Sequence, residues 1–79
     1  MDVSGILVVC RPEHLAETTR RIEEFDWADV HCEDADGRLI ATIEAVDADQ
    51  SVARLKQLQG LPHVVVAELA TYYVGDQPS

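Results

Sequence analysis

The chain has 79 residues, 47% of them hydrophobic and 27% charged, which is the composition of one small globular domain and excludes global disorder. Six Lys and Arg against fifteen Asp and Glu give a net charge of −9. A field of this sign repels nucleic acid and anionic lipid, and it attracts basic segments. We therefore expect a cationic partner and no nucleic acid, with solubility as the alternative use of the charge.

The amino terminus and the cysteines indicate the compartment. Asp2 stands where a signal peptide carries basic residues, "GILVV" is too short for the apolar region of such a peptide, and no stretch is long enough to span a membrane. Cys10 and Cys32 lie outside any CxxC motif, so we expect free thiols. These features predict a cytoplasmic protein without membrane insertion.

The first half of the chain predicts a strand, a helix and a hairpin. Residues 3–10 are aliphatic and β-branched and stop before Pro12, a residue that suits the first turn of a helix. Apolar side chains recur at helical spacing over residues 12–25. Residues 27–34 and 38–45 alternate between apolar and polar side chains on either side of the turn "ADG", which is typical of a hairpin.

The second half predicts a helix and a last strand. Asp47 is expected to cap the helix, with Gln50 three positions later as its capping-box partner. Gly60 is expected just past the end of the helix in the left-handed conformation common there. The run of valines and aromatic residues over 64–72 predicts the final strand.

The order of elements, βαββαβ, predicts the fold class. Two right-handed βαβ units, residues 3–34 and 38–70, interleave into a ferredoxin-like α+β sandwich. Its antiparallel sheet of four strands has the order 4-1-3-2, with two helices on one face. We expect residues 1–74 to form the single domain and residues 75–79 to form a flexible C-terminal tail.

With both helices on one face, the opposite face of the sheet has no cover from this chain. Alternation along the strands then assigns side chains to this open face. In the first strand both alternating sets are apolar, and the outward set is predicted to be Ile6, Val8 and Cys10. The outward residues on the other strands are predicted to be Asp29, His31, Glu33, Ile40, Thr42, Glu44, Val64, Val66, Glu68, Ala70 and Tyr72. Apolar surface bordered by charge is typical of a protein or peptide site, with homodimerisation as the alternative cover.

No pattern in the sequence indicates catalysis. In "HCED" neighbouring residues alternate faces of a strand, so His31 and Cys32 cannot share a metal ion. His14 and His63 lie in other elements without a nucleophile, and no glycine-rich phosphate loop is present. Arg11 follows the first strand as in acylphosphatases, but "CRPEH" lacks the glycine that a phosphate cradle needs. We predict no catalytic residue, no metal site, no cofactor and no enzyme activity.

Three segments, "SGILVVCRPEHL", "DGRLIATIEA" and "LPHVVVAELATYY", resemble the NapD-type chaperones of periplasmic nitrate reductase assembly in their order and spacing. The resemblance covers nearly the whole chain. It implies a ferredoxin-like fold and a cytoplasmic chaperone. It further implies that the partner is the twin-arginine signal peptide of the molybdenum-containing catalytic subunit, whose export is held back until the cofactor is inserted.

The resemblance and the open face together predict the binding residues. Glu44 and Glu68 would meet the two guanidinium groups, and apolar neighbours would meet the stretch that follows them. The predicted peptide-binding residues are Ile6, Val8, Cys10, Ile40, Thr42, Glu44, Val64, Val66, Glu68 and Tyr72. We expect a monomer that binds a basic amphipathic helix across the face, with a strand added along an edge as the alternative. A dimeric, small-molecule-sensing domain of the ACT or Lrp type has the same order of elements and is the competing function.

Overall fold

The computed structural model describes the backbone of residues 2–74 and the side chains of residues 2–70. Its elements are β1 (Asp2–Cys10), the 3-10 turn η1 (Pro12–His14), α1 (Leu15–Glu23), β2 (Ala28–Glu33), β3 (Arg38–Ala45), α2 (Ala48–Gln59) and β4 (Val64–Val74). The predicted order of elements is confirmed. The predicted tail, residues 75–79, lies outside the described residues.

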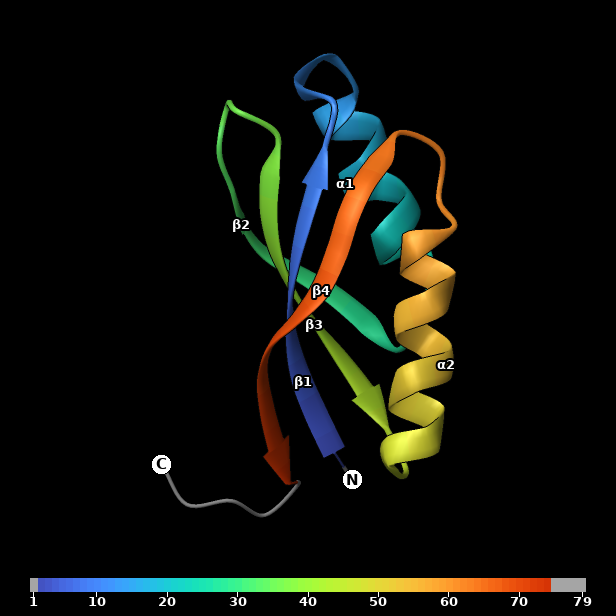
Figure 1. Cartoon of the computed structure of the whole chain (residues 1–79). Coiled ribbons are helices and arrows are strands. Elements are labelled where there is room, and N and C mark those ends of the chain that lie inside the picture. Colours follow the sequence, from blue (N-terminus) through green and yellow to red (C-terminus); the bar gives the residue numbers. More distant parts are fainter. Residues whose placement is uncertain (1, 75–79) are drawn as a thin grey trace.

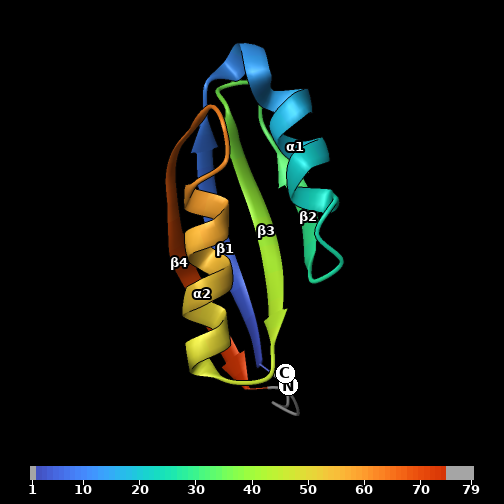
Figure 2. The same ribbon diagram turned by 90° about the vertical axis from the view of Figure 1, so that its right-hand side faces the viewer.

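The four strands form one antiparallel sheet in the order β2-β3-β1-β4, which is the predicted order read from the other edge. Both helices lie on the same face of this sheet (Figures 1 and 2). α1 packs on β2, and α2 packs on β4, β3 and β1. The ferredoxin-like α+β sandwich is therefore confirmed, including a sheet face that neither helix covers.

The core lies between the helices and the sheet. It consists of Ile6, Val8, Ile22, Ala28, Leu39, Ala41, Ile43, Leu58 and Ala67, to which every strand and both helices contribute. Burial of each large aliphatic side chain is worth about 1.5–3 kcal/mol. Phe25 and Trp27 stack with their ring centroids 4.4 Å apart and pack against this core from the segment that leads into β2.

The ends of α2 confirm one sequence prediction and correct another. The Asp47 carboxylate accepts the backbone N–H of Gln50 at 2.8 Å, as predicted for the N-cap. Gly60 ends the helix with φ −87°, so the expected left-handed conformation was wrong. Left-handed backbone occurs instead at Gly37, with φ +96°, and at His63, with φ +71°. The predicted first helix is also divided, because η1 precedes α1.

Candidate functional site

The alternation of β1 decides which side chains reach the open face. Ile6, Val8 and Cys10 are at most 2% exposed and lie on the face that the helices cover, so their predicted placement on the open face was wrong. Leu7 and Val9, between them, are half-buried and point to the open face. Both alternating sets of this strand are apolar, so the sequence does not distinguish them. Leu7 and Val9 could have been assigned to the open face only from the residues with which β1 pairs on the neighbouring strands.

Two irregularities in β4 change the faces of its side chains. Val9 pairs with Val66 and Cys10 pairs with Val64, which leaves Val65 as an extra residue in a bulge. Val64 consequently turns toward the helices and packs against the core, so its predicted outward placement was wrong. Val66 and Glu68 are exposed on the open face as predicted.

The same strand contains the predicted site residue Tyr72. Its backbone pairs with that of Ser4, beyond a second register shift between Gly5 and Ile6. The side chain of Tyr72 lies outside the part of the chain that the structure describes.

A third irregularity lies in β2 at His31. After it, Cys32 pairs with Ile40 on the open face, while Glu33 turns to the helix side. The Glu33 carboxylate there accepts the hydroxyl of Thr19 in α1 at 2.6 Å, so its predicted outward placement was wrong. His31 is on the open face as predicted, where its Nε2 lies 2.7 Å from the Thr42 hydroxyl oxygen.

Together the strands present an apolar stripe on the open face, with acidic groups around it. One row of paired residues, Cys32, Ile40, Leu7 and Glu68, crosses all four strands. The apolar stripe consists of Val3, Leu7, Val9, Ile40 and Val66. The carboxylates that border it belong to Asp29, Glu44 and Glu68. Gly5, which has no side chain, lies on this face between β3 and β4. The predicted outward positions of Ile40, Thr42 and Glu44 are confirmed.

A shallow depression of about 220 Å³ lies where the stripe meets the β2–β3 turn. It is lined by Leu7, Cys32, Glu33, Asp34, Arg38 and Ile40. Arg38 does not leave a free positive charge here, because its guanidinium lies 3.1 Å from the Asp34 carboxylate and 3.6 Å from that of Asp36. Burial raises the pKa of Asp34, but hydrogen bonds from the backbone of Arg38 and Asp36 outweigh it and hold that pKa below its usual value.

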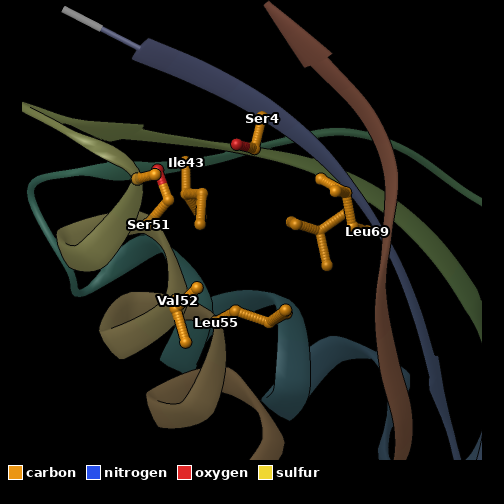
Figure 3. Close-up of a pocket in the computed structure, with 8 residues that line it drawn as sticks. Ser4, Ile43, Ser51, Val52, Leu55 and Leu69 are labelled. Atoms are coloured by element: carbon orange, nitrogen blue, oxygen red, sulfur yellow. The ribbon is translucent and has the colours of Figure 1, made fainter.

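A separate cavity of about 160 Å³ lies on the helix-covered face, between α2 and the sheet (Figure 3). It is lined by Ser4, Ile6, Ile43, Ala48, Ser51, Val52, Leu55 and Leu69. The hydroxyls of Ser4 and Ser51 are buried and have no hydrogen-bond partner among the described residues. Ile6, predicted to bind the peptide, lines this cavity instead, so α2 stands between it and any ligand on that side.

The fold and the open face define a class of protein, the small ferredoxin-like domains that leave one sheet face bare. Within this class, the family model described as NapD protein matches residues 1–75, and the chain belongs to that family. The solution structure of the E. coli Tat proofreading chaperone protein NapD is similar, with a TM-score of 0.83 and 20% sequence identity. The match covers 98% of this chain and 82% of that one. No curated protein matches the sequence.

Among the described residues, no helix has the length and apolar character that crossing a lipid bilayer requires.

Proposed function

We propose that the protein is an assembly chaperone that binds the twin-arginine signal peptide of a periplasmic nitrate reductase catalytic subunit. The observation that carries the proposal is the apolar stripe of the open face with Asp29, Glu44 and Glu68 around it. A twin-arginine peptide has matching chemistry, because two guanidinium groups precede its apolar stretch. Membership of the NapD family supports the same role, as does the likeness to a Tat proofreading chaperone.

The carboxylates and the apolar stripe would bind different parts of such a peptide. Guanidinium groups make bidentate, charge-assisted hydrogen bonds to carboxylates, each worth about 1.5–3 kcal/mol when well placed. Glu68 lies directly beside Leu7 in the sheet, so one peptide segment can contact a carboxylate and the stripe together. The net charge of −9 adds a longer-range attraction that accelerates association.

The edges of the sheet favour a helix across the open face over an added strand. At the β4 edge, the Gln59 side chain donates to the Ala67 carbonyl at 2.9 Å and so occupies an acceptor that an added strand would need. The bulge at Val65 further disrupts pairing along this edge. At the β2 edge, the bulge at His31 has the same effect. A basic amphipathic helix needs neither edge.

We further propose that the chaperone is a monomer, that it acts in the cytoplasm and that it has no catalytic activity. The charge of the open face supports the monomer. Two copies that met through their open faces would bring together two surfaces that each carry Asp29, Glu44 and Glu68, and each chain has a net charge of −9. Like charges across an interface destabilise it. A Tat substrate is held before export, so its chaperone acts in the cytoplasm, and binding requires no reacting group.

Calorimetric titration with a synthetic signal peptide tests the proposal. We expect binding in the micromolar range or tighter, and we expect Glu68→Lys to weaken it by about tenfold or more, which corresponds to 1.4 kcal/mol. Thermal stability should hardly change, because Glu68 is exposed and outside the core. A peptide with Lys-Lys in place of Arg-Arg should bind more weakly, because lysine cannot form the bidentate contact.

Glu23→Lys is the matched control, because Glu23 is an exposed carboxylate on α1, on the covered side of the sheet. It changes the net charge equally, so its smaller effect should largely disappear as salt is added. If Glu68→Lys binds as tightly as the parent, the open face is not the site. If neither peptide binds and the protein elutes as a dimer, the sensor function is favoured instead.

A further inference from the structure

Two histidines from distant parts of the sequence meet beside a carboxylate at one end of the sheet. His14 belongs to η1, His63 precedes β4, and Glu17 lies in the first turn of α1. The rings of His14 and His63 stack with centroids 3.5 Å apart and planes 5° apart. His14 Nδ1 lies 3.7 Å from Glu17 Oε1. One ligand atom from each residue lies within 4.8 Å of the other two.

The backbone at His63 is strained, and the strain places its ring in this cluster. Pro62 and His63 are the central residues of a turn closed by a hydrogen bond from the Val64 N–H to the Leu61 carbonyl at 3.3 Å. With Pro second and a φ of +71° third, the turn resembles type II, in which the third position favours glycine. A residue other than glycine is unfavourable in this backbone conformation, so its presence here indicates that the side chain of His63 has a role.

Backbone hydrogen bonds hold the two histidine segments together through Arg11. The Arg11 N–H donates to the His63 carbonyl at 3.2 Å, and the His14 N–H donates to the Arg11 carbonyl at 2.9 Å. The His14 carbonyl also accepts the Thr18 hydroxyl at 2.8 Å. These bonds fix the positions from which the rings extend, which lowers the entropic cost of bringing ligands together.

The Glu17 carboxylate is oriented by Arg21, with one oxygen toward His14. Its Oε2 accepts from Arg21 Nε at 3.1 Å, and this hydrogen bond holds the pKa of Glu17 below its usual value. Its other oxygen, Oε1, lies 3.7 Å from His14 Nδ1. Arg21 therefore orients the carboxylate without occupying both oxygens.

We propose that His14, Glu17 and His63 form a binding site for a divalent first-row metal ion, with zinc as the best match. Two imidazoles and one carboxylate are a donor set that zinc uses with water as its fourth ligand. Ligand atoms around tetrahedral zinc lie about 3.3 Å apart, given bonds of about 2.0–2.1 Å. The three side chains are only partly buried, so small torsional changes bring their atoms to that separation.

Binding requires the stacked rings to turn. A metal ion lies in the plane of each imidazole that binds it, and two parallel rings do not share a plane. One ring must therefore tilt away from the stack, which gives the binding event a structural signature at His14 and His63. The site contains no residue of the apolar stripe or of the carboxylates around it, so zinc binding and peptide binding can be tested independently.

The test uses the full chain without an affinity tag and titrates it with zinc chloride by calorimetry. We expect one zinc ion per chain. Mutation of residues that hydrogen-bond to metal ligands, without contacting the metal, weakens metal binding by about 10–100-fold. Loss of a ligand should cost at least as much, so we expect His14→Gln to weaken zinc binding by at least about tenfold. His63→Gly should do the same while leaving the protein at least as stable, because glycine relieves the left-handed turn. Cobalt, as a coloured substitute, should show the absorption of a tetrahedral site.

His31→Gln is the control, because His31 is an exposed histidine bonded to Thr42 and outside the cluster. It should bind zinc like the parent, and zinc should shift the imidazole NMR signals of His14 and His63 but not those of His31. If the parent binds no zinc, or if His63→Gly binds it as tightly as the parent, the site does not exist. If His31→Gln weakens binding as much as His14→Gln, the ion binds elsewhere.

Discussion

The two faces of the sheet are built from alternate residues of the same strands, yet they perform different tasks. On the covered face, Ile6 and Val8 are fully buried beneath the helices. On the open face, their neighbour Leu7 lies between Ile40 and Glu68, and Ile40 is 38% exposed. Substitutions on the first face should therefore change the free energy of unfolding. Substitutions on the second should change binding with little effect on folding.

The neighbours Ile6 and Leu7 give the largest expected contrast. Ile6→Ala should lower the free energy of unfolding by about 2–5 kcal/mol, because it enlarges a cavity that already exists beneath α2. Leu7→Ala should cost about 1 kcal/mol or less, because Leu7 is only half-buried, and it should weaken peptide binding. Urea unfolding and calorimetry measure the two effects. Equal destabilisation by both variants would mean that the open face is itself covered, for example by a second copy.

Substitution of Gly37 should give the next largest loss of stability. Gly37 lies in the turn between β2 and β3, where its backbone contacts the end of β1. Its carbonyl accepts the Cys10 N–H at 2.8 Å, and a Cβ added at its φ of +96° would collide with the Cys10 carbonyl. Gly37→Ala should therefore cost about 2 kcal/mol or more in unfolding free energy.

Gly60→Ala is the control for this prediction. An added Cβ there would lie 3.6 Å from the Lys56 carbonyl oxygen, an ordinary contact, and φ is not left-handed. Thermal unfolding should show a change within about 0.5 kcal/mol. A loss at Gly60 equal to that at Gly37 would contradict the assignment of the strained glycine.

Lowering the pH should produce the smallest change in stability, and this change should arise in the β2–β3 turn beside the open face. The pKa of Asp34 is lowered in the folded protein, so its contribution to stability is present above its ordinary pKa of 3.8 and is lost as pH falls below it. The difference in stability between the parent and Asp34→Asn should therefore shrink below about pH 4. Amide shifts of Asp36 and Arg38 should report the same transition. A difference that persists at low pH would show that the Asp34 charge is not responsible.

The fold and much of the open face could be predicted from the sequence alone. Alternation in residues 38–45 placed Ile40, Thr42 and Glu44 correctly, because that strand has polar residues on one side only. The cap at Asp47 followed from local chemistry, since its partner is three residues away. The order of elements determined the topology, because right-handed βαβ units of this length interleave in one common way.

The faces to which the side chains of β1 and of the ends of β2 and β4 point depend on contacts between strands and helices. Glu33 and Val64 were misplaced because alternation along a single strand takes no account of the extra residue in a bulge, and bulges form only when a strand pairs with its neighbours. Ile6, Val8 and Cys10 were misplaced for a different reason. In β1, side chains on both faces are apolar, and only packing beneath the helices selects one set. The meeting of His14 with His63 was likewise not predictable, because residues 49 positions apart come together through the pairing of β1 with β4 and not through local spacing.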